Sequence, residues 1–212
     1  MKKIIYLMLL TLLVSCNKHN SVNERFYQAF GVVKESEGKL YIETDKSQTI
    51  NPSVASILSI ADKDKRVWTL YTTENNSLDA IKADIFELLR VTEFNIQNDG
   101  LDTLKADPVS LKDIWIAHDY LTLIMEISAK TENSLALHKY SMYSDMVVSN
   151  DTLNLEFRYD SNNDEQLRKY EKVIALKLSK DLNPNSESTV LAIRYNPGRG
   201  TQKTIYMTYK PE

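Results

Sequence analysis

Short segments in which apolar and polar residues alternate constrain the fold of this chain more than any other feature. In the clearest one, apolar residues at 153, 155, 157 and 159 alternate with Asn154, Glu156 and Arg158. A period of two puts the two kinds of side chain on opposite faces of a half-buried antiparallel strand. The same pattern predicts further strands at 113–116, 121–127, 135–143, 173–178, 190–195 and 204–209. Seven short strands at this spacing predict a β-sandwich.

The first half of the chain also contains short strand patterns. We expect strands at 26–33, 39–44, around Thr49 and at 66–73, with a turn at Glu37-Gly38 and a break at Asn51-Pro52. Residues 79–94 fit two periods, because Ile81, Ala83 and Ile85 alternate as in a strand, while Ile81, Ile85, Leu88 and Leu89 would share a helical face. The spacing alone leaves strand and helix open there.

Turn-forming residues divide the two halves. Residues 98–108 contain Asn98-Asp99-Gly100 and Asp107-Pro108, which are typical of turns and linkers. We therefore expect a first domain at 26–97, a linker at 98–108 and a second domain at 109–212.

The N-terminus has the pattern of a lipoprotein signal peptide. Lys2 and Lys3 precede an apolar run at 4–14, and Leu13-Val14-Ser15 leads into Cys16, the only cysteine of the chain. A membrane-spanning helix needs roughly 20 apolar residues, so this run is too short to be one. We predict a signal peptide at 1–15 and lipid attachment at Cys16; the alternative is a soluble secreted protein with an unmodified cysteine.

Residues 16–25 are polar and are expected to form a lipidated tether. Nine extended residues reach about 30 Å, enough to place a domain just clear of the lipid headgroups. The residues after Cys16 contain neither an acidic run nor an aspartate next to the cysteine. We therefore expect a lipid anchor in the outer membrane, facing the periplasm rather than the cell surface.

The composition and the motifs argue against several functions. The 29 acidic residues outnumber the 26 basic ones, so nucleic acid is not an expected partner. The common catalytic and phosphate-binding signatures are absent, so we expect neither an enzyme nor a cofactor. The histidines, His19, His118 and His138, lack metal-ligand spacing and are expected to be ordinary tether, surface or strand residues.

One segment has part of a calcium-loop pattern. Its residues Asp160, Asn162, Asp164 and Glu171 match positions 1, 3, 5 and 12 of such a loop. However, Glu165 stands where the loop needs glycine, and a strand rather than a helix precedes it. We therefore expect a polar loop between two strands, with calcium binding as the alternative.

Aromatic residues suggest a second kind of site. Trp68, Tyr71 and Trp115 could form a sugar-stacking platform, but each lies in an apolar strand pattern, which favours core packing. Alternation places Tyr206 on the face opposite Ile205 and Met207, so Tyr206 is expected to be exposed.

The chain resembles the NigD-like lipoproteins of Gram-negative gut-type bacteria. The resemblance covers almost the whole mature chain and rests on these segments: GVVKESEGKLYIETD, KRVWTLYT, DIWIAHDYLTLIMEI, TLNLEFRYD and TIYMTYKP. It implies a mostly β protein, with a small OB-like β-barrel followed by an antiparallel β-sandwich. The implied barrel favours a strand at 79–94.

The resemblance and the residue patterns together predict a non-catalytic binding or accessory module of the cell envelope. Its partners would be the membrane, through the lipid, and an envelope protein or glycan. Some family members are encoded beside bacteriocin genes, which gives a bacteriocin immunity or export accessory as an alternative. A hydrolase with an unmarked site is a further alternative.

Overall fold

The structure is a computed structural model that describes residues 25–73, 80–97, 104–144, 147–149, 151–183, 186–198 and 200–211. The predicted signal peptide, Cys16, His19, all of the tether except Arg25, and the Asn98-Asp99-Gly100 turn lie outside the described residues. Among the described residues, no helix is both long and apolar enough to cross a bilayer.

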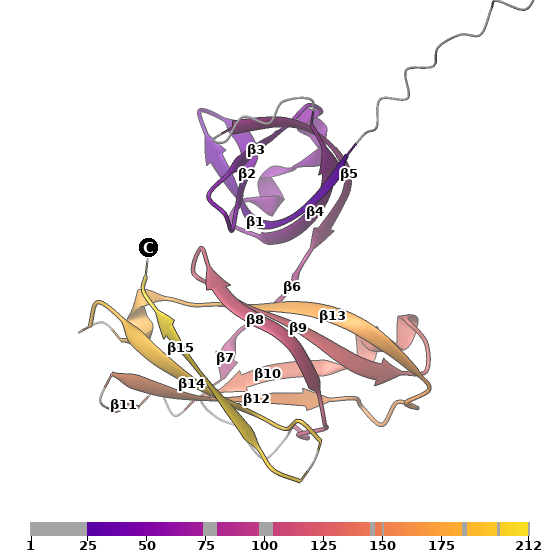
Figure 1. The fold of residues 1–212 in the computed structure, drawn as a ribbon, viewed down its shortest axis with the longest axis vertical. Coiled ribbons are helices and arrows are strands. Elements are labelled where there is room, and N and C mark those ends of the chain that lie inside the picture. The colour runs from indigo at the N-terminus through magenta and orange to yellow at the C-terminus, as the bar shows by residue number, and fades with distance from the viewer. Residues whose placement is uncertain are drawn as a thin grey trace, which may run out of the picture.

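The first half is a closed five-stranded barrel with the strand order β1-β2-β3-β5-β4 (Figure 1). Its strands are β1 (Phe26–Ser36), β2 (Lys39–Thr44), β3 (Thr49–Pro52), β4 (Arg66–Thr72) and β5 (Ala80–Arg90). The 3-10 turns Ala55–Ile57 and Ile60–Asp62 connect β3 to β4. The segment that was ambiguous in the sequence is therefore a strand, and the expected OB-like barrel is confirmed.

Strand β1 closes the barrel because it pairs along its length with two neighbours. Its first part pairs with β4 and its last part with β2, and Gly31 takes part in both ladders. Inward-facing side chains of all five strands fill the interior, with Val33, Ile42, Ile50, Val67 and Ile81 fully or almost fully buried.

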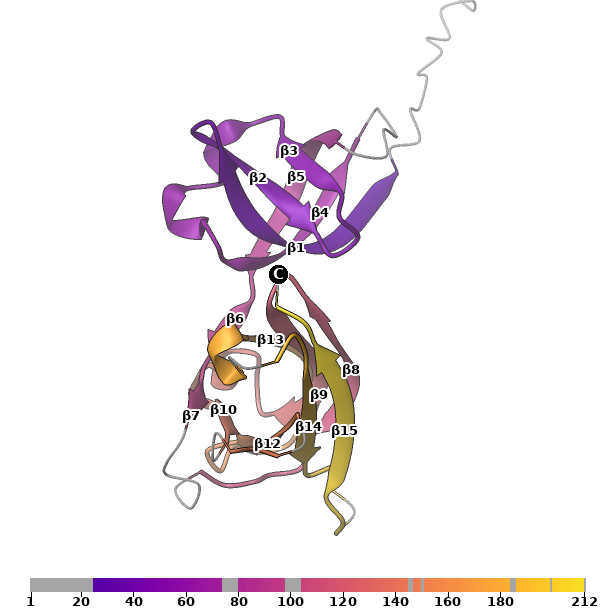
Figure 2. The same cartoon turned by 90° about the vertical axis from the view of Figure 1, so that its left-hand side faces the viewer.

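The second half is a sandwich of two sheets (Figures 1 and 2). One sheet has the order β6 (Thr92–Phe94), β13 (Arg168–Lys177), β9 (Tyr120–Ala129), β8 (Ser110–Ala117). The other has the order β15 (Lys203–Tyr209), β14 (Thr189–Tyr195), β12 (Thr152–Asp160), β10 (Lys139–Tyr143), β7 (Ile96–Gln97), with β11 (Val148–Ser149) beside β12. On β12, Leu153, Leu155, Phe157 and Tyr159 are buried, as their alternation predicted.

The expected boundary after Gln97 is wrong. Strand β6 pairs in parallel with β13, and β7 pairs in parallel with β10. Residues 92–94 therefore belong to one sheet of the sandwich, and residues 96–97 belong to the other. The last barrel strand ends at Arg90. Pairing of such short segments depends on distant partners, and no local periodicity reveals it. The strand expected at 135–143 is also shorter, because residues 133–137 form a 3-10 turn before β10.

A buried carboxylate fixes the connection between β3 and β4. Asp62 is almost completely buried, accepts hydrogen bonds from the backbone and hydroxyl of Ser59, and pairs with Arg90 on β5 at 2.5 Å. The hydrogen bond from Arg90, helped by those from Ser59, lowers the pKa of Asp62 from 3.8 to about 2 against the opposing effect of burial.

We expect Asp62→Asn to destabilise the barrel in a pH-dependent way. A carboxylate whose folded pKa lies below its unfolded pKa stabilises the fold above the unfolded value, by about 2 kcal/mol for a shift of this size. This contribution is lost as the pH falls from about 4 to 2. Urea unfolding at pH 7 and near pH 2 should therefore show a large difference between wild type and variant only at pH 7. The exposed Asp181→Asn change is the control, and a difference that persists at low pH would contradict this account.

Candidate functional site

The barrel and the sandwich meet around a buried arginine. Arg66 begins β4 and is 0% exposed. Its guanidinium donates two hydrogen bonds of 2.5 Å to the carboxylate of Asp45, which follows β2, and its Nε donates to Thr122 of β9 at 3.1 Å. Charge-assisted bidentate bonds of this kind fix both distance and orientation. The ion pair within the barrel is thereby connected to the sandwich.

Two aromatic rings enclose this guanidinium. It lies 5.7 Å from the ring centroid of Phe30 on β1 and 5.9 Å from that of Trp115 on β8. The two rings meet edge to face at 5.1 Å, and the indole N–H of Trp115 donates to Asp45 at 2.7 Å. Asp45 therefore positions Trp115 as well as Arg66.

The turn between β8 and β9 points toward the barrel and makes a second set of contacts (Figure 1). Its residues His118 and Asp119 both have positive φ, as a two-residue hairpin turn requires. His118 Nε2 lies 2.9 Å from the carbonyl oxygen of Thr44. Tyr120 donates to the carbonyl oxygen of Asp64 at 2.6 Å and contacts Glu93 at 3.2 Å. Burial, and then the nearby Glu93, raise the pKa of Tyr120, so this hydroxyl stays protonated.

A cavity of about 440 Å³ opens beside this interface. We call it the interdomain pocket. Aromatic and polar side chains from both halves line it, among them Tyr27, Gln28, Phe30, Asp45, Lys46, Gln48, Trp68, Tyr71, Asp113 and Trp115. Tyr27 and Tyr71 stack with their centroids 5.7 Å apart. Clefts at domain interfaces that combine aromatic walls with a few polar groups are the usual form of a ligand site.

Trp68, Tyr71 and Trp115 were expected to be core residues, and this expectation is wrong for the two tryptophans. Trp68 and Trp115 are only half-buried and line the interdomain pocket, whereas Tyr71 is buried in the barrel core and also reaches the pocket. Both tryptophans lie on outward faces of their strands. The strand pattern could not reveal this, because another domain covers part of each face.

The sequence reasoning missed Phe30, Asp45 and Arg66. Only Arg66 carries a faint signal, since it is the one charged residue of its strand. The burial of Arg66 depends on Asp45, twenty-one positions earlier, and on Thr122 in the other half. No local motif connects such residues.

A second, smaller depression of about 270 Å³ lies on the sandwich over β12, β14 and β15. One of its lining residues is Glu156, which pairs with Arg194 and, at 2.8 Å, with Arg158. Burial alone would raise the pKa of Glu156, but the hydrogen bonds from the two arginines lower it. Tyr206 borders this depression and is 69% exposed, as expected.

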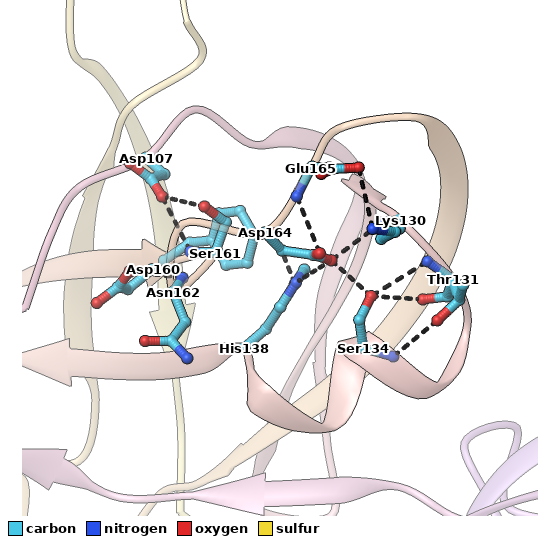
Figure 3. Close-up of polar contacts among 11 residues, drawn as sticks. Asp107, Lys130, Thr131, Ser134, His138, Asp160, Ser161, Asn162, Asp164 and Glu165 are labelled. Atoms are coloured by element: carbon cyan, nitrogen blue, oxygen red, sulfur yellow. Dashed lines mark hydrogen bonds and ion pairs between the residues drawn. The ribbon is translucent and has the colours of Figure 1, made fainter.

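The residues of the partial calcium pattern serve the loop itself. Asp160 accepts from the backbone N–H of Asn162 at 2.8 Å. Asp164 accepts from the N–H groups of Lys130 and Glu165 and lies 2.5 Å from Ser134 Oγ and 3.2 Å from His138 Nε2 (Figure 3). These bonds, that with Ser134 foremost, lower the pKa of Asp164 to about 2.

Glu171, the fourth residue of that pattern, lies on β13 opposite Glu126 of β9. Over the described ranges, no three His, Cys, Asp or Glu side chains gather as a metal site requires. The carboxylates of Asp160 and Asp164 accept hydrogen bonds within the loop, which is a role that turn-forming Asp and Asn commonly have.

The histidines of the described residues have structural neighbours. The side chain of His138 is fully buried between Asp164 and the hydroxyl of Tyr159, which lies 2.8 Å from its Nδ1. In a catalytic serine triad the histidine stands between serine and aspartate, whereas here Asp164 stands between Ser134 and His138. His118 contacts the barrel through Thr44 and lies 3.8 Å from Glu43.

The fold and the pocket define a class: a two-part β protein in which an OB-like barrel and a sandwich enclose an aromatic interdomain pocket. The model of the NigD-like C-terminal beta sandwich domain matches residues 92–209. The chain therefore belongs to the NigD-like family. That match begins at β6, where the structure also places the start of the sandwich.

Solved structures share the whole architecture at low sequence identity. A putative toxin-related protein from Parabacteroides distasonis is 19% identical, with a TM-score of 0.71 over 89% of this chain and 95% of its own. A protein of unknown function from Bacteroides vulgatus is 18% identical, with a TM-score of 0.68 over 87% and 91%. A NigD-like immunity protein from Bacteroides caccae is 19% identical, with a TM-score of 0.67 over 89% and 98%. No curated protein gives a significant match.

Proposed function

We propose that this protein is a non-catalytic, lipid-anchored binding protein of the cell envelope and that it binds a neutral glycan in the interdomain pocket. The observation that carries the proposal is the combination of half-buried Trp68 and Trp115 with polar side chains in one cavity between the two domains.

The chemistry of the pocket suits a sugar ring. The C–H face of a sugar packs against an aromatic face, and its hydroxyl groups need neighbouring amides and carboxylates. Gln28, Gln48 and Asp113 supply such groups at the pocket wall. Asp45 already accepts hydrogen bonds from Arg66 and Trp115, so its role is to hold these two side chains in place.

The position of both tryptophans allows binding to be measured by fluorescence. They are the only two tryptophans of the chain, and both line the pocket, so ligand binding should change the intrinsic fluorescence. The mature protein would be titrated with neutral oligosaccharides of glucose, galactose, mannose and N-acetylglucosamine. For an oligosaccharide that binds, we expect Trp68→Ala to raise Kd about tenfold or more, as removal of an aromatic anchor does.

The matched control is Tyr206→Ala, which removes an exposed aromatic residue outside this pocket and should leave Kd unchanged. If no oligosaccharide of the panel changes the emission at millimolar concentration, or if both variants lose affinity equally, the glycan site is wrong.

The anchor proposal rests on the order of Lys2, Lys3, the apolar run and Cys16. It is supported by a putative lipoprotein of Bacteroides fragilis that shares this fold at 11% identity, with a TM-score of 0.63 over 89% of this chain and 98% of its own. In cells fed a clickable palmitate, wild type should label and sediment with membranes, and Cys16→Ala should do neither. Labelling of the alanine variant would refute the anchor. The outer membrane and its periplasmic face are part of this proposal.

A further inference from the structure

The outer surface of the barrel has an apolar area that the sandwich leaves exposed. Phe26 on β1 is 54% exposed, and Phe86 and Leu89 on β5 are 56% and 51% exposed. Together with the half-buried Leu70 of β4, they form what we call the barrel apolar face. Contiguous exposed apolar surface of this kind on a soluble domain marks an interaction site.

Strand register shows that these side chains are neighbours. Phe26 and Phe86 meet edge to face with their centroids 5.1 Å apart. Leu89 pairs with Trp68 across the β4–β5 ladder, so it lies where this face borders the interdomain pocket. Phe86 is the extra residue where that register shifts, between the pairs of Leu70 with Glu87 and Tyr71 with Ile85. A bulge of this kind turns a side chain outward.

The position of this face in the chain indicates what covers it. Phe26 is the tenth residue after Cys16, so the face begins where the chain leaves toward the proposed lipid anchor. The nine residues between them span at most about 30 Å when extended and less otherwise. Any protein anchored at Cys16 therefore holds this face within a short distance of the bilayer.

The chemistry of the face suits the interfacial layer of a bilayer. Peripheral membrane-binding surfaces commonly insert Trp, Phe and Leu side chains at the boundary between headgroups and acyl chains. The exposed charges beside the face on β5 have both signs: Lys82, Asp84, Glu87 and Arg90. Such a rim gives no net attraction to anionic lipids, so apolar burial would be the main driving force.

We propose that the barrel apolar face lies against the bilayer, so that the barrel sits next to the membrane. This inference rests on the proposed lipid anchor. The anchor holds the protein at the surface, and the face then determines its orientation, because a weak contact becomes effective when a tether supplies a high local concentration.

The test supplies the anchor chemically, so that its outcome is independent of lipidation in the cell. The mature chain is coupled through Cys16 to a maleimide lipid in phosphatidylcholine vesicles, with or without bromine near the top of the acyl chains. Phe86→Trp places a reporter in the face, and Leu167→Trp places one at an apolar position of the sandwich that is at least as exposed. Wild type gives the background from Trp68 and Trp115.

We expect bromination to lower the added emission of Phe86→Trp about twofold, since interfacial side chains reach about 5–10 Å into the headgroup and acyl boundary. The added emission of Leu167→Trp should not change. Adding Phe26→Ser and Leu89→Ser to Phe86→Trp should restore the emission. Equal quenching at both positions, or no quenching at position 86, would overturn the proposal.

A second copy of the chain is the competing occupant. In that case the emission of Phe86→Trp would depend on protein density in the vesicle and not on bromination, which would also overturn the proposal. Failure of the palmitate experiment would refute the anchor without affecting the result in these vesicles.

Discussion

Arg66→Ala is expected to destabilise the protein by about 3–5 kcal/mol, because removal of one partner from a buried ion pair leaves an uncompensated charge. Arg66 is fully buried, and Asp45, Thr122, Phe30 and Trp115 all contact its guanidinium. The substitution would leave the Asp45 carboxylate facing the space that the guanidinium filled.

The substitution should weaken the coupling between the two domains as well as lower the stability. Arg66 is bonded within the barrel through Asp45 and to the sandwich through Thr122. We therefore expect urea unfolding of the variant to begin at lower denaturant concentration, with the barrel and the sandwich losing structure separately. Tryptophan emission should also shift to longer wavelength, since Trp115 loses the neighbours that hold it.

Two further variants make this prediction specific. Lys63→Ala removes an exposed ion pair with Glu35, so it should have no measurable effect. In Arg66→Met with Asp45→Leu, both charges are replaced by apolar groups, and part of the lost stability should return. A single variant Arg66→Ala that unfolds like wild type would show that the ion pair does not connect the domains.

Gly31→Ala should destabilise the barrel by about 3 kcal/mol or more, which lowers the Tm of a chain of this length by about 6–12 °C. A Cβ atom at Gly31 would lie 2.4 Å from the carbonyl oxygen of Glu43 and 2.7 Å from Cγ2 of Ile42. The oxygen belongs to the backbone of β2, so it cannot move away without disturbing the pairing of β1 with β2.

Gly38→Asn is the matched control for Gly31→Ala. Gly38 has a φ of +74° in a hairpin turn, and a Cβ atom there would meet nothing within 4 Å. Asparagine tolerates this conformation, so only a small change is expected. Thermal unfolding followed by circular dichroism compares the two variants. Equal Tm values for both variants would mean that β1 and β2 can move apart at Gly31 with little loss of free energy.

The sequence predicts the fold where a local pattern determines it. Alternation at 153–159 depends on burial of one face, and the Glu37-Gly38 turn depends on positive φ, which the structure shows for both residues. The strand at residues 80–90 needed the family resemblance, since spacing alone left a helix open.

The candidate site could be predicted only in part. Trp68 and Trp115 were selected by residue type, but their environment depends on how the two domains meet. Arg66 and Asp45 were not selected, since their pairing joins residues on different elements of a folded barrel. The calcium pattern is the opposite case, in which residues were selected by spacing alone. The spacing matched part of a calcium loop, whereas in the folded loop Asp160 and Asp164 accept hydrogen bonds.

Strands β6 and β7 determine where the chain can be cut to give a stable fragment of the sandwich. They complete one edge of each sheet of the sandwich, β6 beside β13 and β7 beside β10. A fragment that starts at residue 98 or 109 would expose both edges at once, and unpaired edges are templates for aggregation. A fragment that starts at or before Thr92 would keep them. The few residues after the barrel therefore act as a built-in protection of the sandwich against self-association, and any exchange of barrels between relatives must carry them along.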